Sequence, residues 1–368
     1  MTDVILENAL IERLARGLPR SPLQVNGLQE SDAELVRLPG TSLVLAVKTD
    51  CIVEEIESGL YKDPELIGWM AVTVNASDLA AVGAEPLGIV LAETLPPGTG
   101  DEFVGALKLG IGAACERYAL PVLGGDTNFS AHMQIGGCAI GLIREGPLIT
   151  RVGCRPGDRL YASGPLGAGS AFAFAELGSG AREAAPGAGV GGASSAAPFR
   201  PVARLAEGAI VRRFGSACMD TSDGVLATLD QLLRLNGVGF RVDRPPEELL
   251  TRAALVSARA ARVPPWMMLA GPHGEFELVF TVPGPRAAAF EDAAAQAGWL
   301  PLVLGDVVAE PGVTLAFDGG RGPLDTGAVR NLFAEVAGDV GRYVEGLLRL
   351  RPAAQRISQA TTPAGTST

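Results

Sequence analysis

The apolar and polar positions of the N-terminal half change their period several times, which predicts alternating helices and strands. Residues 5–14 carry apolar side chains at helical spacing, whereas residues 42–47 form an apolar run typical of a strand. Asp63 followed by Pro64 reads as a helix cap and a first helical residue, so a helix should continue to about Val82. This alternation predicts an α/β or α+β fold.

The same pattern predicts further elements along the chain. Strands are expected at residues 87–95, 121–123, 133–143, 277–282 and 302–308, and helices at residues 101–118 and from Gly224 to Asn236. Gly237 should end the last of these helices. The glycines of residues 164–169 lack the Lys-Ser/Thr of a phosphate loop, so a tight turn into a helix is expected there.

A chain of 368 residues with 47% hydrophobic residues is long enough for two domains. We place the boundary near residue 145, which gives an N-terminal domain of residues 1–145 and a C-terminal domain of residues 146–340. Residues 178–198 are almost wholly Gly, Ala, Ser and Pro, which predicts a flexible surface insertion. The tail, residues 352–368, is predicted to be disordered.

Aspartates recur in short contexts of small residues, where a packed core has little use for a charge. They are Asp32, Asp50, Asp78, Asp126, Asp220 and Asp223. Several follow strand-like runs or lie in the apolar helix that starts at Pro64, so their carboxylates should converge on cations. Hard oxygen ligands favour Mg²⁺, which keeps water and substrate phosphates as its other ligands. The alternative for any single residue is a turn or a helix cap.

Composition narrows the class of function. The formal net charge is −11, and clustered cations that could hold a nucleic-acid backbone are lacking. No apolar run approaches the roughly 18 residues of a membrane span, and the start of the chain does not resemble a signal peptide. Five cysteines without a CxxC pair fit a reducing compartment. We therefore expect a cytoplasmic protein that binds neither nucleic acid nor membrane.

Five motifs together resemble the thiamine-monophosphate kinase family of the aminoimidazole ribonucleotide synthetase superfamily. Residues 74–86 are close to the family's AVNLSDLAAMGA-x-P, residues 124–127 to its GGDT, residues 150–153 to its TRSGA and residues 220–224 to its D-x-SDGL. Lys48-Thr49-Asp50 stands where the family has STD. The resemblance covers most of the chain and implies a two-domain fold whose N-terminal domain dimerises through a sheet.

The resemblance also implies site residues. Metal ligands would be Asp32, Thr49, Asp50, Asp78, Asp126, Asp220 and Asp223, and contacts to ATP would come from Gly125, Arg151 and Ser222. Asp126 and Asp223 are the implied catalytic pair, with Mg²⁺ and ATP as cofactors. Because metals and Arg151 would supply the positive charge, the absence of a phosphate-loop lysine is expected.

The substrate side differs from the family pattern at two positions. The family has a histidine that contacts thiamine phosphate where this chain has Glu57. Its GGEDYELLF is replaced by residues 271–280, so that the first glutamate, a substrate contact, falls on Gly274 when the Glu-Leu pair is aligned. Glu275 could take that role after a shift of one residue.

Three functions remain open on the sequence. The first is an ATP- and Mg²⁺-dependent kinase for a small phosphorylated acceptor, with thiamine monophosphate as the leading case. The second is an ATP-dependent enzyme that activates an amide for ring closure or dehydration, as in other members of the superfamily. The third is a nucleotide-binding protein without catalysis. ADP with a phosphorylated product would indicate the first function, and ADP with free phosphate the second.

Overall fold

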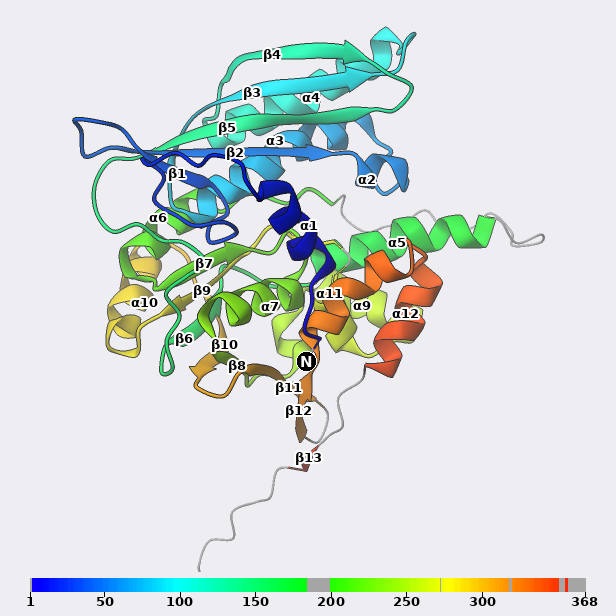
Figure 1. Cartoon of the computed structure of the whole chain (residues 1–368). Helices are drawn as coiled ribbons and strands as arrows, with labels where there is room; N and C mark the ends of the chain where they lie inside the picture. Colours follow the sequence, from blue (N-terminus) through cyan, green and yellow to red (C-terminus); the bar gives the residue numbers. More distant parts are fainter. Residues whose placement is uncertain (1, 184–198, 272, 318–319, 351–354, 357–368) are drawn as a thin grey trace, which may run out of the picture.

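The computed structural model describes residues 2–183, 199–271, 273–317, 320–350 and 355–356 of the chain (Figure 1). Two β-sheets, one in each half of the sequence, form the centres of its two parts. Among the described residues, no helix is long and apolar enough to cross a membrane.

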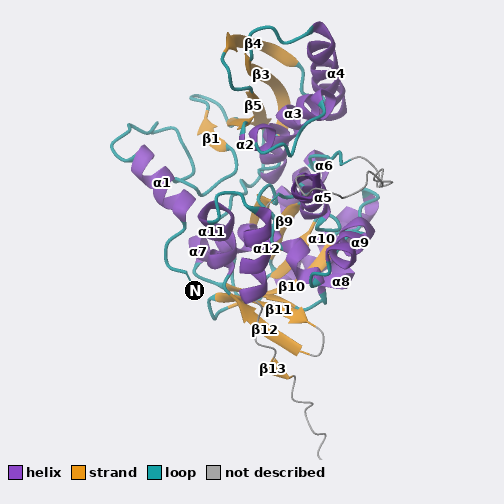
Figure 2. Cartoon of the chain, turned by 90° about the vertical axis from the view of Figure 1, so that its right-hand side faces the viewer, coloured by secondary structure: helices purple, strands orange, loops and turns teal. Residues whose placement is uncertain are grey.

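The N-terminal sheet has five strands in the order β1-β2-β5-β3-β4. Their bounds are Glu34–Arg37 (β1), Val44–Ile52 (β2), Gln134–Ile143 (β5), Glu85–Leu95 (β3) and Val122–Phe129 (β4). Only the pair of β3 and β4 is parallel. Helices α3 (Pro64–Ala81) and α4 (Asp101–Tyr118) cover one face, and the other face is open (Figure 2).

Helix α3 is the central element of this part. The Asp63 side chain caps it by accepting a hydrogen bond from the Glu65 backbone N–H, as the Asp63-Pro64 signal predicts. At Gly68 and Gly110 the backbones of α3 and α4 approach so closely that a Cβ would lie 2.1 Å from Leu107 O or 1.9 Å from Glu65 O. The tight crossing buries α3 between the sheet, α4 and the C-terminal part, with its polar residues enclosed.

The C-terminal sheet has eight strands in the order β13-β12-β11-β8-β10-β6-β9-β7. These are Arg159–Ala162 (β6), Ala217–Asp220 (β7), Gly239–Val242 (β8), Leu278–Val282 (β9), Leu302–Val308 (β10), Gly312–Phe317 (β11), Gly320–Leu324 (β12) and Gln355–Arg356 (β13). Side chains along β9 point alternately to the two faces of the sheet. Phe280 packs on one face with Phe290, whereas Val279 packs on the other, in the larger core with Leu229.

Helices surround this sheet on both faces. They are α5 (Ala168–Glu183), α6 (Leu205–Phe214), α7 (Val225–Asn236), α8 (Pro246–Leu249), α9 (Arg252–Ala261), α10 (Ala287–Gln296), α11 (Thr326–Glu335) and α12 (Val340–Arg349), with 3₁₀ turns at Pro265–Leu269 and Gly284–Arg286. Gly237 ends α7 in the left-handed conformation, as predicted. The first helix of the chain, α1 (Leu6–Ala15), is tied to α11, where the Asn331 side chain bonds the backbone of Val4 and Leu6.

Three sequence predictions need correction. The strand expected at residues 121–123 continues to Phe129, because its glycines and polar residues lie on an exposed edge strand where apolar alternation is not required. Residues 178–183, expected in a flexible insertion, belong to α5, since a helix that has already formed can extend residue by residue even through Gly178 and Gly180. Residues 184–198 lie outside the described residues. In the tail, Gln355 and Arg356 pair with β12, and residues 357–368 are not described.

Candidate active site

Three aspartates from distant segments meet where the two parts of the chain join. Asp32 precedes β1, Asp78 lies near the end of α3, and Asp220 ends β7. One carboxylate oxygen from each lies within 4.8 Å of the others, and all three residues are buried. The structure thus brings three of the predicted acids together.

Hydrogen bonds across the domain junction hold Asp220. The Ser77 hydroxyl of α3 donates to Asp220 Oδ2 over 2.6 Å, and the Ser222 hydroxyl donates to Oδ1 over 3.0 Å. Thr228 in the first turn of α7 donates to the Asp220 backbone carbonyl. These contacts fix the orientation of the carboxylate without neutralising it.

Two cations border the trio. The Arg151 guanidinium donates to Asp32 Oδ1 at 3.0 Å, and its backbone N–H donates to the carbonyl of Glu30. Lys48 Nζ lies 3.3 Å from Asp78 Oδ2 and 3.7 Å from Asp50 Oδ2. The predicted ATP contact Arg151 is therefore engaged with an acid of the site.

Burial and mutual repulsion shift Asp78 and Asp220 toward the protonated state. Burial, followed by the charge of Asp32, raises the pKa of Asp220 to about 6. Burial also raises the pKa of Asp78, although the neighbouring Lys48 acts in the opposite direction. A group of carboxylates that is this costly to ionise indicates a site built for a positively charged ligand.

The residues of the trio fit a magnesium ion. All the donor atoms are carboxylate oxygens, which hard divalent cations prefer. Asp32 Oδ2 is buried and makes no hydrogen bond, so one oxygen is available without losing a partner. We assign Asp32, Asp78 and Asp220 as the residues that would hold the ion.

The sheet separates two of the predicted metal ligands from this trio. Side chains alternate along β2, so Lys48 and Asp50 face α3 while Thr49 faces the open side, where its hydroxyl donates to Gly137 O. In the strand register Asp126 lies in the row of Cys51 and Gly136, on that same open side. Within one chain, Thr49 and Asp126 therefore lie apart from the trio, and their role as metal ligands stays a prediction.

The other predicted nucleotide and metal residues lie around the pocket or at the sheet edge. Asp50 is fixed by a double hydrogen bond between its backbone and the Asn75 side chain. Ser222 and the exposed Asp223 follow Asp220 in the turn before α7. Gly125 lies beside Asp126 in β4, where a Cβ would be 2.8 Å from Leu91 O. Their contacts with nucleotide stay predictions.

Glu57, at the position where the resemblance has a histidine, meets a histidine from elsewhere in the chain. It ends α2 (Glu54–Glu57), and its carboxylate lies 2.8 Å from Nδ1 of His132 in the loop between β4 and β5. Both side chains are exposed, and the contact of Glu57 with substrate stays a prediction. Glu57 and His132 thus form a carboxylate–imidazole pair on the surface.

Glu275 has an internal role. Its buried carboxylate accepts a hydrogen bond from the Gly167 backbone N–H at 2.8 Å and contacts the Thr221 hydroxyl at 3.4 Å. Burial, with the charge of Glu277, raises its pKa to about 8. Glu275 therefore ties the turn before α5 to the turn after β7, and its predicted contact with substrate has no support in this arrangement.

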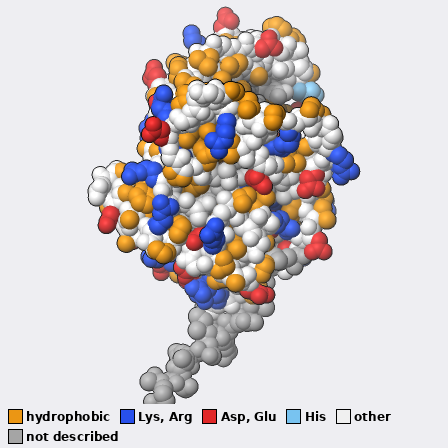
Figure 3. All heavy atoms as spheres, turned by 60° about the vertical axis from the view of Figure 1, so that its left-hand side comes forward, with side chains coloured by type: hydrophobic (Ala, Val, Ile, Leu, Met, Phe, Trp, Pro, Cys, Tyr) orange, Lys and Arg blue, Asp and Glu red, His pale blue; other side chains and the backbone are white. Residues whose placement is uncertain are grey.

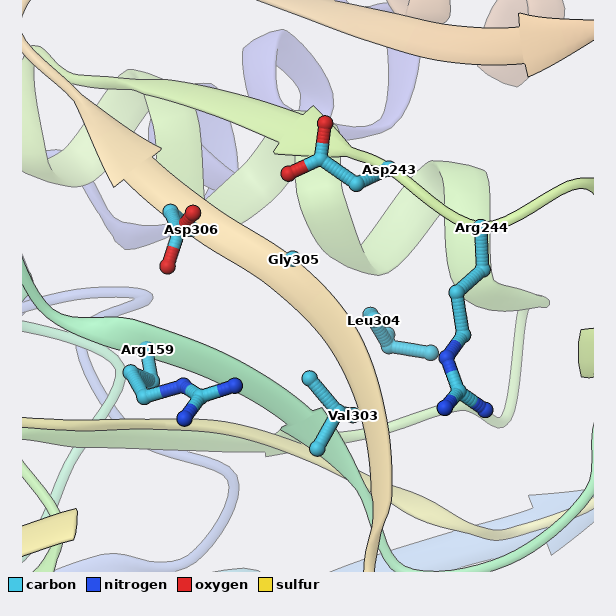
Figure 4. A pocket seen from close by; sticks show the side chains of 7 residues that line it. All are labelled: Arg159, Asp243, Arg244, Val303, Leu304, Gly305 and Asp306. Carbon is cyan, nitrogen blue, oxygen red and sulfur yellow. The ribbon is translucent and has the colours of Figure 1, made fainter.

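A separate hollow of about 260 Å³ lies on the C-terminal sheet, away from the trio (Figure 4). Its lining residues are Arg159, Asp243, Arg244, Val303, Leu304, Gly305 and Asp306. The two aspartates form ion pairs with Arg241 and Arg321. Because its charges are balanced by neighbours, this hollow has less of the character of an active site than the acidic pocket.

Sequence reasoning missed three residues that shape the pocket: Lys48, Asn75 and Ser77. Lys48 was identifiable, because residues 48 and 50 lie on the same face of a strand and therefore close to the same acids. Asn75 and Ser77 lie in the motif that carries Asp78, but their partners come from β2 and β7, which no local spacing indicates.

Comparisons with known proteins agree with this geometry. Residues 30–143 match the family model "AIR synthase related protein, N-terminal domain", and residues 155–318 match the corresponding C-terminal domain. The thiamine-monophosphate kinase of Methanospirillum hungatei is 30% identical over 68% of this chain and 79% of its own. That of Salmonella typhimurium is 30% identical over 85% of this chain and 94% of its own.

Solved structures show the same fold. AaThiL complexed with AMPPCP and TMP matches with a TM-score of 0.66 and 25% identity, over 84% of this chain and 92% of that chain. The protein tt0281 from Thermus thermophilus matches with a TM-score of 0.68 and 31% identity, over 83% and 95%. The predicted family and two-domain α/β fold are confirmed. The chain belongs to the thiamine-monophosphate kinase family and is an ATP-dependent kinase with the AIR synthase-related fold.

Proposed function

We propose that this protein transfers the γ-phosphoryl group of ATP to thiamine monophosphate with the help of Mg²⁺, in the cytoplasm, as a homodimer. The observation that carries the proposal is the pocket of Asp32, Asp78 and Asp220 at the domain junction. Relatives named for this reaction, and a related structure complexed with AMPPCP and TMP, support the choice of substrates.

The chain's own residues would bind and orient the reactants. Asp32, Asp78 and Asp220 present oxygen ligands from three segments, and Ser77 and Ser222 fix the direction of one of them. A bound Mg²⁺ would neutralise phosphate charge and orient the transferred group. Phosphoryl transfer needs position and charge balance more than covalent help from the protein, and a pocket held by two domains supplies both.

A ³¹P NMR time course with Mg-ATP and thiamine monophosphate tests the reaction. We expect ADP and a new diphosphate signal to appear together. In the same preparation, Mg-ATP at about 100 times its Kd should stabilise the protein by roughly 2.7 kcal/mol, measured by thermal unfolding. ATP with EDTA is the control. Free phosphate without a new diphosphate would contradict the kinase assignment, and a melting temperature that Mg-ATP leaves unchanged would contradict the site.

The proposed dimer would use the open face of the N-terminal sheet. Val90 and Leu123 are exposed there by 39 and 57%, and hydrophobic side chains reach the surface in this upper part of the molecule (Figure 3). A second copy on this face would cover them. It would also bring Asp126 into the interface, which explains how that residue could serve a site it does not reach within its own chain.

Mixing two inactive variants tests whether Asp126 acts across the dimer. Asp126→Asn and Asp220→Asn should each lose turnover. After unfolding and refolding together, half of the dimers are mixed, and one of their two sites is intact, so about a quarter of wild-type activity should return. The measurement is ADP release, with light scattering to confirm the dimer. No recovery in mixed dimers would place both residues in the same chain's site.

Glu57 gives a prediction about the acceptor. If its carboxylate faces the acceptor's phosphate, Glu57→His removes a like charge and should raise kcat/KM for thiamine monophosphate about tenfold. Glu116→His, an exposed substitution of the same kind on α4, is the control. A loss of activity in Glu57→His would instead show that the pair of Glu57 and His132 is a working part of the substrate site.

A further inference from the structure

Lys48 lies among the acids of the pocket without being part of any reaction role assigned above. It projects from β2 toward α3, and its ammonium lies between the carboxylates of Asp78 and Asp50, at 3.3 and 3.7 Å. Asp78 is one of the three residues that would hold Mg²⁺. The Lys48 ammonium is therefore paired with Asp78, a carboxylate that would bind the divalent ion.

The contact of Lys48 with Asp78 and Asp50 matters because the pocket holds more carboxylates than cations. Four carboxylates lie together, those of Asp32, Asp50, Asp78 and Asp220. In the described part of the chain, their ion pairs come from two cations, Lys48 and Arg151. When all four carboxylates are ionised, two negative charges are left over, and like charges about 4 Å apart repel strongly at the dielectric of a partly buried site. Without Lys48 the metal-free pocket would carry three.

The two cations are held in different ways. Arg151 is anchored by its backbone, which bonds Glu30 and Asn236, and its side chain also reaches the carbonyl of Gln29. The Lys48 ammonium has ion pairs with two acids but no hydrogen bond to a neutral group in the described residues. Its side chain is 25% exposed on a flexible four-carbon stem, so it has space to move. The contacts of Arg151 hold it in place, whereas the Lys48 ammonium can move away from Asp78 without losing a hydrogen bond to a neutral group in the described residues.

We propose that Lys48 is a built-in counter-ion, which holds Asp78 and Asp50 together in the metal-free protein and releases Asp78 when the divalent ion binds. The proposal rests on the magnesium site of the proposed function. It makes Lys48 a positioning residue that sets the affinity for metal: the ion must displace an ammonium, so the site stays organised when empty and binds metal more weakly than its acids would allow alone.

Metal binding without nucleotide tests the proposal directly. Lys48→Met removes the charge and keeps most of the stem. We expect it to bind Mn²⁺ about tenfold more tightly than wild type, measured by electron paramagnetic resonance of free Mn²⁺, and Mg²⁺ likewise by calorimetry. The metal-free variant should melt at a lower temperature than wild type, and saturating Mg²⁺ should reduce that difference.

Two further variants keep the result interpretable. Lys108→Met, on the exposed side of α4, should change neither affinity nor melting temperature. Lys48→Arg keeps the charge, and its affinity for metal should stay within about threefold of wild type. This variant can still be measured if Lys48→Met does not fold without metal. Metal binding of equal strength in wild type and Lys48→Met would overturn the counter-ion role while leaving the kinase function intact. Absence of metal binding in every variant would overturn both.

Discussion

Replacing Asp220 by asparagine should abolish turnover and, at the same time, stabilise the metal-free protein at neutral pH. Asparagine keeps the shape of the side chain and an oxygen that Ser77 and Ser222 can still reach. It removes one charge from a buried group of three. Loss of a carboxylate that would bind metal should lower kcat by at least about 100-fold, measured as ADP release.

The expected gain in stability follows from the pKa of this group. Burial raises the pKa of Asp220 to about 6, from the ordinary 3.8. Its protonated form thus favours the folded state, and that contribution is complete below about pH 4 and is lost as the pH rises through 6. At pH 8 the ionised carboxylate costs about 3 kcal/mol, which Asp220→Asn should recover.

A comparison at two pH values isolates this effect. The buried His273, whose pKa burial lowers to about 4, opposes the acids between pH 6.5 and 4, but it contributes equally to wild type and variant. The difference in unfolding free energy between Asp220→Asn and wild type should therefore grow from near zero at pH 4 to about 3 kcal/mol at pH 8. Denaturant unfolding without metal measures it.

Asp230 provides the matched control. It is also buried in the C-terminal part, but Arg234 bonds it at 2.7 Å and Thr326 donates to it. Asp230→Asn should lose stability, because it leaves a buried cation with a weaker partner, and it should keep turnover. If Asp220→Asn behaves like Asp230→Asn, the acids of the pocket are structural and the metal site is wrong.

The elements that the sequence predicted well have strong local signals. The Asp63-Pro64 cap, the glycine after Asn236 and the uninterrupted helical spacing of α4 each fix a boundary without help from the rest of the fold. The short helices and strands after Asn236 were largely not predicted. Helices α9 and α12 were identifiable, because their apolar and polar residues recur at helical spacing, whereas the alanine-rich α10 gives a weak pattern.

The sequence indicated the acids of the pocket, but their arrangement only in part. Asp32, Asp78 and Asp220 each stand in a recognisable motif, so their residue types were enough to indicate a metal site. Which acids actually meet depends on the strand register and on which face of the sheet each side chain takes. The alternation along β2 could have separated Thr49 from Asp50, but no local pattern indicates that Asp126 lies on the open face.

The second large effect is expected at Gly274, where the resemblance has a glutamate. A Cβ on this residue would lie 1.4 Å from the Thr221 carbonyl oxygen and 2.8 Å from that of Ser222. The Gly274 N–H donates to Ser222 O at 2.8 Å, so the two backbones are in direct contact. Gly169, at the start of α5, approaches just as closely, since its Cβ would lie 2.0 Å from Gly274 O.

Gly274→Ala should therefore destabilise the protein by about 3 kcal/mol or more, because backbone atoms on both sides must move to admit one methyl group. The turn from Asp220 to Asp223 would shift with them, so turnover should also fall well beyond what partial unfolding explains. Thermal unfolding and ADP release at a temperature where the variant is folded separate the two effects. Gly112→Ala is the control: its Cβ meets nothing within 4 Å, and the exchange should stabilise α4 by about 0.5–1 kcal/mol.

This packing fits a glycine at the position where the resemblance has a glutamate. A glutamate at position 274 has no room while the turn after β7 contacts the backbone there, and Glu275 already binds the turn before α5. Gly274→Glu should accordingly fail in the same way as Gly274→Ala and should not improve turnover of thiamine monophosphate. Wild-type stability in both variants would show that the three segments lie further apart than described, and position 274 would again be open to a substrate contact.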